Sequence, residues 1–260
     1  MNDAVAGRIA GIFRHPVKGF TPEPLDHTEL AAGAGFPNDR LFAVENGPSG
    51  FDPAAPGFIP KQKFAVLAAI ADVAKARTRY DETTGVLTAA APGLPPIAAD
   101  LAAPDGRAGF AAWLTALLGN EIRGPLQVVQ APGHQFLDHP LGHVSLINLA
   151  SLRDLAAKIG RPVDPRRFRA NLYVEGWPAW VELSEGIDSF KLGSARATLF
   201  KPIVRCVATH VDPDTAVRDI EIVRALYDHY GHQHCGIYVH ITEGGRVALD
   251  DAATACRSRG

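Results

Sequence analysis

The chain has 260 residues, 47% of them hydrophobic and 21% charged, and its formal net charge is −2. This length and composition predict a globular protein with one large core or two smaller ones. A charge this close to zero argues against a nucleic acid or an anionic membrane as partner. The three cysteines match no disulfide framework, the N-terminus does not read as a signal peptide, and no apolar run reaches a membrane span. We therefore expect a cytoplasmic protein.

Alternating apolar residues predict strands along most of the chain. The first two are Arg8 to Phe13 and Arg40 to Asn46, and the Pro- and Gly-rich residues 47–60 after them predict a long loop. Residues 76–91 predict a hairpin that turns at 81–85. Further strands are predicted at LQVVQ, HVSLINL, NLYVEG, SARATLF, CGIYVHI and RVALD. The last two are expected to form a hairpin through residues 242–245.

Three helices are predicted between these strands. Their signals are an apolar face from Phe110 to Leu118 before Gly119, an N-cap at Ser151 with a stop at Gly160, and an N-cap at Asp219 with a stop at Gly231. Strands outnumber helices and do not alternate with them regularly. This argues against a doubly wound nucleotide-binding sheet and favours a β-rich α+β or barrel fold.

The stretch HYGHQHCGIYVH concentrates potential metal ligands. It holds His229, His232, His234, Cys235 and His240, and imidazole and thiolate are good ligands for zinc or iron. However, the residues straddle a predicted helix end and then enter a strand, where alternate positions face opposite sides. We therefore interpret this stretch as a helix end followed by a barrel strand.

A second stretch, RPVDPRRFRANLYVEG, concentrates arginines before a strand. Its four guanidinium groups fit either a solvated loop or an anion site, because the guanidinium fork binds phosphate bidentately. Arg169 and Asn171 lie two positions apart and would share one face of an extended segment. Lys18 of HPVKG, taken alone, reads as an exposed lysine.

Cys206 lies in the stretch KPIVRCVATHVDPDT. Its apolar residues, Val207 and Ala208 among them, predict a buried or half-buried strand before the Asp-Pro-Asp turn. Arg205 is adjacent to the thiol, and a neighbouring cation favours the thiolate. A thiolate can be a nucleophile, a sulfur carrier or a soft-metal ligand, whereas a free cysteine is also common as a small core residue. The local sequence leaves these alternatives open.

Several of these stretches, taken in order, resemble MOSC proteins, named after the C-terminal domain of molybdenum-cofactor sulfurases and related to the amidoxime-reducing component. They are IFRHPVKGFTPEPL, NDRLFAVENG, FRANLYVEG, KPIVRCVATHVDPDTAVRD and YGHQHCGIYVHITEGGRV, over roughly residues 8–248. The resemblance implies a β-rich α+β fold, with a MOSC-type β-barrel preceded by a smaller N-terminal β-barrel-like subdomain and a few peripheral helices. We place the N-terminal region at residues 1–125 and the MOSC domain at 126–260. Ala216 departs from the family pattern, in which glycine usually follows VDPxT.

The resemblance also implies a cofactor site. It implies molybdenum-molybdopterin, with Cys206 as the catalytic residue and molybdenum ligand. The cofactor-binding residues that it implies are Lys18, Arg40, Arg169, Asn171, Arg205 and His143. A soft thiolate suits molybdenum, and Lys and Arg suit the pterin phosphate. No pyridoxal phosphate is expected, because the chain has no room for a desulfurase domain.

Two functions follow from this resemblance. The first is an oxidoreductase that reduces N-hydroxylated or N-oxide and S-oxide small molecules, with electrons from a separate flavin, haem or ferredoxin-type protein. The alternative is a sulfur carrier that holds a persulfide on Cys206 and receives its sulfur from a separate donor. A third reading is a cofactor-storage protein.

Overall fold

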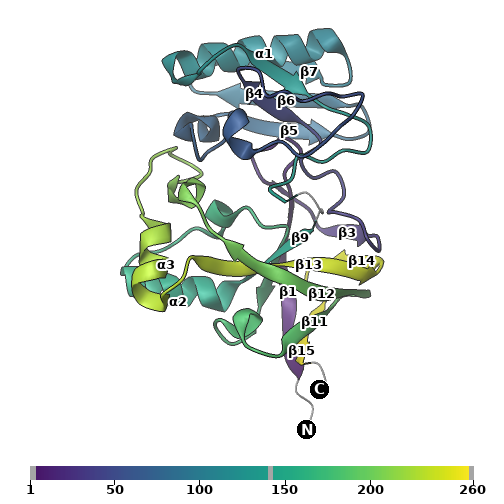
Figure 1. The fold of residues 1–260 in the computed structure, drawn as a ribbon, viewed down its shortest axis with the longest axis vertical. Coiled ribbons are helices and arrows are strands. Elements are labelled where there is room, and N and C mark those ends of the chain that lie inside the picture. Colours follow the sequence, from purple (N-terminus) through teal and green to yellow (C-terminus); the bar gives the residue numbers. More distant parts are fainter. Residues whose placement is uncertain (1–3, 140–142, 258–260) are drawn as a thin grey trace.

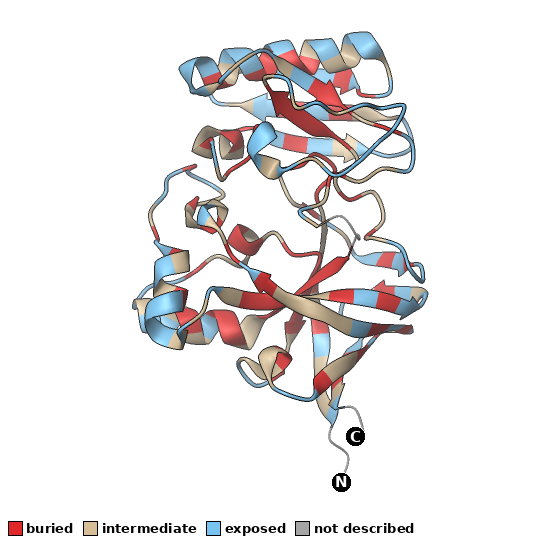
Figure 2. Ribbon diagram, viewed as in Figure 1, coloured by how far each residue is buried: buried red, intermediate tan, exposed pale blue. Residues whose placement is uncertain are grey.

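The structure, a computed structural model, describes residues 4–139 and 143–257. Figure 1 shows two parts stacked along the long axis of the molecule. In Figure 2 the buried residues run along the interior of each part, and exposed residues cover the outer helices and loops. No helix in the described ranges is long and apolar enough to cross a membrane.

Seven strands of the described chain close the larger part into a barrel. Their order is β10 (Leu172–Glu175), β9 (Val144–Asn148), β13 (His234–Glu243), β12 (Ala195–Val204), β11 (Ile187–Leu192), β15 (Ala252–Arg257) and β1 (Ala4–Arg14), and β1 pairs back with β10. The β9–β10 pair is parallel and is connected through α2 (Leu149–Ile159), as a parallel pair requires a crossover. The short strand β2 (Glu23–Pro24) adds to β1. The predicted β-rich fold with a barrel and a few helices is confirmed.

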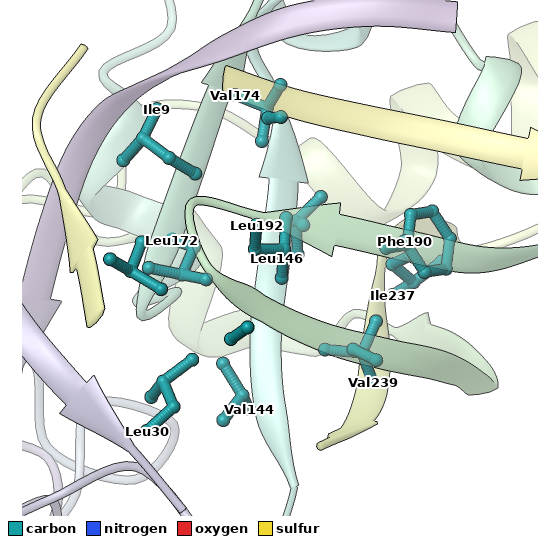
Figure 3. Close-up of a cluster of buried hydrophobic side chains, with 14 of the residues drawn as sticks. Ile9, Leu30, Val144, Leu146, Leu172, Val174, Phe190, Leu192, Ile237 and Val239 are labelled. Atoms are coloured by element: carbon teal, nitrogen blue, oxygen red, sulfur yellow. The ribbon is translucent and has the colours of Figure 1, made fainter. Parts of the chain in front are cut away.

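Apolar side chains from these strands fill the barrel. Because successive side chains of a strand face opposite sides, β12 buries Ala195 and Ala197 and exposes Arg196 and Thr198. Figure 3 shows the resulting cluster, in which Leu146, Leu172, Val174, Ile237 and Val239 point toward one another. Burial of each large aliphatic side chain contributes about 1.5–3 kcal/mol. The packed core therefore holds β9, β12 and β13 in fixed positions.

The smaller part has its own core. The strands β5 (Arg77–Asp81), β6 (Val86–Ala91) and β7 (Leu94–Asp100) form a meander, and β4 (Ala43–Asn46) pairs with β8 (Leu126–Val129). The helix α1 (Pro104–Leu118) packs Phe110, Trp113 and Leu114 against this layer and against Phe20. The hairpin predicted at residues 81–85 is confirmed as the β5–β6 turn.

Shorter elements complete the fold. The strand β3 (His27–Leu30) pairs with β14 (Gly245–Ala248), and α3 (Ile222–Tyr230) covers the side of the barrel near α2. The 3-10 helices are η1 (Lys61–Lys63), η2 (Ala71–Lys75), η3 (Gly119–Glu121), η4 (Pro165–Phe168), η5 (Val181–Leu183) and η6 (Val207–His210). The division after residue 125 stays a prediction, and β1 and β3 from before it pair with strands that follow it.

The helix stops were predicted correctly and two helix starts were not. Gly119, Gly160 and Gly231 follow the last residues of α1, α2 and α3. The N-cap of α2 is Asn148 rather than Ser151, because the Asn148 side chain accepts the hydrogen bond from the Ala150 amide while the Ser151 hydroxyl donates to Glu182. Asp219 does not cap α3, since α3 begins at Ile222 and the Asp219 carboxylate pairs with arginines.

Two strand predictions were also wrong. The segments CGIYVHI and RVALD do not form a hairpin with each other, because β13 pairs with β12 and β9 while β14 pairs with β3. The predicted strand through Val207 and Ala208 ends instead at Val204, and η6 follows Cys206. The thiol therefore lies at a corner between a barrel strand and a helical turn, and not inside a strand.

Candidate functional site

A cavity of about 280 Å³ lies between the two parts of the molecule. One wall comes from η1 and the loops beside the smaller part, and the other comes from η4, η6 and the end of β12. The cationic side chains along it are Lys18, Arg40, Lys61, Arg167, Arg169, Lys201 and Arg205. Among the described residues that line it, Asp138 supplies the one carboxylate. This excess of positive charge makes the cavity suitable for an anion.

Cys206 is half-buried at the edge of this cavity. It lies between the end of β12 and the start of η6, and the Thr209 amide and hydroxyl both donate to its backbone carbonyl. The Lys61 ammonium approaches the sulfur to 3.3 Å between Nζ and Sγ. Burial acts to lower the pKa of Lys61, but Asp138 and Cys206 raise it above its usual value. The sulfur therefore has a charged ammonium beside it.

Two backbone carbonyls and an aromatic ring hold Arg205, the neighbour of the thiol in the sequence. Its Nε donates to the Cys235 carbonyl at 2.7 Å and its Nη1 donates to the Phe168 carbonyl at 2.9 Å, and its guanidinium lies 5.2 Å from the centre of the Phe168 ring. Arg205 thus fixes the corner that carries Cys206 to β13 and η4. The cation in contact with the sulfur is Lys61, which comes from the other part of the molecule.

Arg40 and its neighbours form a buried charged group under the cavity. The Arg40 guanidinium pairs with Asp39, and Asp39 also accepts from the His15 amide at 2.6 Å and lies 3.1 Å from His15 Nδ1. Burial lowers the pKa of His15 to about 3, so this histidine is neutral at pH 7. Burial acts to raise the pKa of Asp39, but Arg40 and His15 lower it to about 2. The pair presents Arg40 to the cavity as a fixed cation.

Arg169 reaches the same cavity from η4. Its Nη1 donates to the Phe20 carbonyl, and its backbone carbonyl accepts from Arg40 Nη2 at 3.4 Å. Burial, followed by the charge of Arg40, lowers the pKa of Arg169 to about 10, so the group stays cationic at pH 7. Arg40 and Arg169 both have left-handed backbones, with φ of 53° and 52°. Strained backbones of this kind concentrate at functional sites, where the surrounding structure holds them.

Lys18 is a buried cation and not the exposed lysine that its local sequence predicts. Its Nζ donates to the Phe136 carbonyl at 2.9 Å and to Asp138 at 2.5 Å. Burial lowers its pKa, and Asp138 opposes this effect. The aliphatic stem is enclosed while the ammonium reaches the cavity wall.

Two predicted cofactor-binding residues lie outside the cavity wall. The Asn171 side chain accepts from the Ser145 amide and hydroxyl and donates to the Phe13 carbonyl, so it ties β1 to β9. Arg169 and Asn171 do not share a strand face, because Arg169 ends η4 before β10 begins at Leu172. The His143 ring stacks on Phe200 with ring centres 3.7 Å apart, and burial lowers its pKa to about 4.

The remaining basic and histidine residues are distributed around the site. Of the arginine stretch, Arg167 lines the cavity and pairs with Asp212, whereas Arg161 and Arg166 make ion pairs on the surface. The structure separates the histidine stretch, placing His229 at the end of α3 and burying Cys235, whose pKa burial raises to about 12. Among the residues that the structure describes, no three His, Cys, Asp or Glu side chains are grouped to hold a metal ion.

Seven polar residues of the described cavity lining were not identified from the sequence. They are Lys61, Asp138, His139, Ser145, Lys201, Thr209 and Tyr238. Lys61 begins the short helix η1 and Asp138 lies in a loop, and neither belongs to a periodic pattern, so no local signal indicated them. Tyr238 follows Gly236 within the strand motif GIYVHI, and that motif was the signal that would have found it.

Unpartnered buried donors show what the cavity would accept. The Nη2 atoms of Arg169 and Arg205 are buried and have no hydrogen-bond partner among the described residues. A buried charged donor without an acceptor is costly, so an anionic group that reaches these atoms would be stabilised. The side chains of the cavity fit a phosphate-bearing pterin cofactor. Guanidinium and ammonium groups suit its phosphate, and a lone thiolate suits a soft metal that carries its other ligands with it.

Comparisons with known proteins assign both parts of the chain. The model of the MOSC N-terminal beta barrel domain matches residues 6–121, and that of the MOSC domain matches residues 134–254. Among solved structures, the YuaD protein of Bacillus subtilis is 14% identical with a TM-score of 0.48, each chain being covered fully. YiiM of Geobacillus stearothermophilus is 17% identical with a TM-score of 0.36, covering 52% of this chain and 68% of its own. No curated protein matches the sequence.

Proposed function

Because the chain belongs to the MOSC family, we propose that its cavity binds a molybdopterin-type molybdenum cofactor and that Cys206 ligates the molybdenum. The family is associated with this cofactor. The observation that carries the proposal is the position of the Cys206 thiol at the edge of a cavity with seven Lys and Arg side chains and, among its described lining, one carboxylate. A soft-metal ligand and an anion site are thus adjacent.

The cavity residues would have two roles, binding the pterin phosphate and positioning Cys206. Lys18, Arg40 and Arg169 would hold the pterin phosphate, since their cationic groups are fixed by buried contacts before any ligand arrives. Arg205 holds the corner that presents Cys206. When bound, the cofactor supplies two-electron oxygen-atom chemistry. The cationic side chains of the cavity would hold its negative charge.

We propose that the reaction is the reduction of N-hydroxylated or N-oxide and S-oxide small molecules. Release of the oxygen as water consumes two electrons and two protons per substrate. The electrons would come from a separate protein with a flavin, a haem or an iron–sulfur cluster. The free thiols of Cys206, Cys235 and Cys256 support a reducing compartment such as the cytoplasm.

One observation favours the alternative function of sulfur carrier. Cys206 is only half-buried, and the Lys61 ammonium beside it would equally support a persulfide anion. In this case Cys206 would hold sulfur received from a separate donor and pass it to a cofactor, without turnover of its own.

The deciding experiment compares wild type with Cys206→Ser after expression in a host that makes molybdopterin. The measured quantities are molybdenum per chain and the fluorescence of the oxidised pterin, with Cys256→Ser as the matched control. The reductase proposal predicts stoichiometric molybdenum that is lost in Cys206→Ser alone, and reduction of an N-hydroxylated compound with an artificial electron donor. A protein without metal that carries a persulfide on Cys206 by mass spectrometry supports the carrier. If Cys206→Ser changes neither the molybdenum content nor a persulfide signal in the mass spectrum, both proposals are wrong.

A further inference from the structure

The carboxylate of Asp138 lies within the cationic wall of the cavity. The Lys18 ammonium donates to Asp138 Oδ1 at 2.5 Å and to the Phe136 carbonyl at 2.9 Å. Lys18 is almost fully buried, whereas the Asp138 side chain is 44% exposed and lines the cavity. The buried ammonium therefore holds a carboxylate that a ligand can reach.

This carboxylate is charged at pH 7. Burial acts to raise its pKa, but the charges of Lys18, Arg40 and Lys61 hold the pKa well below the usual range. The other carboxylates near the site face their own arginines, with Asp39 on Arg40 and Asp212 on Arg167. An anion that enters the cavity therefore encounters one fixed negative charge, that of Asp138, among the cationic side chains of the described lining.

We propose that Asp138 determines which anions the cavity accepts. It repels an anion that has no hydrogen-bond donor, and it accepts a ligand that carries both an anionic group and N–H donors for its carboxylate. The inference rests on the proposed function, because the amino and amide N–H groups of a pterin ring are donors of this kind. Asp138 would then act as a specificity residue that keeps the cavity free of simple inorganic anions.

The physical reason is an asymmetry between the two ligand classes. A like charge within about 4–6 Å disfavours an anion, and an anion without donors has no compensating contact to offer. A ligand with N–H groups converts the same carboxylate into a charge-assisted hydrogen-bond acceptor. A site whose acceptors are placed to hydrogen-bond a ligand discriminates against ligands that lack the matching donors.

The test uses the full chain prepared without cofactor and two probes, sulfate and carboxypterin. Sulfate is a dianion without hydrogen-bond donors, and carboxypterin is a fluorescent anion with pterin N–H groups. We expect Asp138→Asn to bind sulfate about tenfold more tightly and carboxypterin about tenfold more weakly than wild type. Asp26→Asn, which changes an exposed aspartate outside the cavity, should alter neither affinity. Unchanged affinities in Asp138→Asn would overturn the proposal.

Asp138→Asn removes the partner of buried Lys18, so a second measurement covers the case in which this variant does not fold. In the wild-type chain, carboxypterin should bind at least about tenfold more tightly than sulfate. Equal affinities of the wild type for the two probes contradict the role of Asp138, whatever happens to the variant. Neither probe contains molybdenum, so these affinities test the role of Asp138 independently of the proposed function. The proposed function is tested by whether the molybdenum content depends on Cys206, and that result leaves the two affinities unaffected.

Discussion

Lys61 and Cys206 lie 145 positions apart in the sequence and meet with 3.3 Å between the ammonium nitrogen and the sulfur. Lys61 belongs to η1, at the end of the long loop of the smaller part, whereas Cys206 follows the barrel strand β12. The smaller part therefore contributes directly to the environment of the thiol, in addition to forming one cavity wall.

The first prediction concerns this contact. Lys61→Met removes the ammonium that contacts the sulfur and stabilises negative charge on it during attack, so alkylation by iodoacetamide at pH 7 slows about five- to tenfold. The rate is measured by mass spectrometry of the peptide that contains Cys206. Lys63→Met is the matched control, because it removes an exposed lysine from the same turn. Equal rates in Lys61→Met and wild type would show that the contact has no effect on the thiol.

The second prediction concerns Ala216, a residue with a Cβ in a left-handed backbone conformation. Its φ is 61°, a left-handed conformation that costs a residue with a Cβ about 1 kcal/mol. Ala216→Gly should therefore raise the free energy of unfolding by about 0.5–1 kcal/mol, measured by urea denaturation. Ala208→Gly in η6 should lower it. A destabilised Ala216→Gly would mean that the buried methyl group contributes more than the backbone strain costs.

The third prediction is a pH dependence of stability due to His15. Its pKa is about 3 in the folded protein because it is fully buried, and near 6.5 when unfolded, so the unfolded chain binds the extra proton between these values. Stability is fully present above pH 6.5 and falls with decreasing pH, by about 1 kcal/mol per pH unit from this group. Urea unfolding between pH 7 and pH 4.5 should show a smaller decrease for His15→Gln than for wild type. The exposed His27→Gln should keep the wild-type slope.

The fourth prediction concerns the corner that carries Cys206. Arg205→Met leaves the Phe168 and Cys235 carbonyls without their charged donor, which should lower the free energy of unfolding by about 2–3 kcal/mol. Arg224→Met on the exposed side of α3 should change it by less than about 0.5 kcal/mol. A similar small change in Arg205→Met would indicate that the corner is fixed by its backbone alone.

The sequence predicted the elements of the barrel better than their partners. Alternating apolar residues mark a strand because the pattern is local, and so β1, β9, β10 and β12 lie where the pattern indicates. The pairing of β14 with β3, instead of with β13, joins segments more than 200 residues apart and leaves no local signal. The two predicted helix starts were wrong for a related reason, because Ser151 and Asp219 form contacts with residues distant in the sequence instead of capping a helix.

In the site, too, residues within sequence motifs were predicted, whereas residues that depend on long-range contacts were not. The motif order indicated Lys18, Arg40, Arg169, Arg205 and Cys206, and the structure brings these residues to one cavity. Their roles as ligands of the cofactor stay predictions. Lys61 and Asp138 were not indicated, because each acquires its partner only when distant loops are brought together, across 145 and 120 positions.

The closed order of the barrel strands has a consequence for how the protein is made. Because β1 sits between β10 and β15, it gains its two barrel neighbours only after residues 172–175 and 252–257 have been synthesised. Until then its apolar residues, Ile9 and Ile12 among them, and its backbone edges are open to other chains. The smaller part, whose meander is local, can form in the meantime. Nascent chains that stall before β10 should therefore be clients of chaperones that shield an unpaired strand.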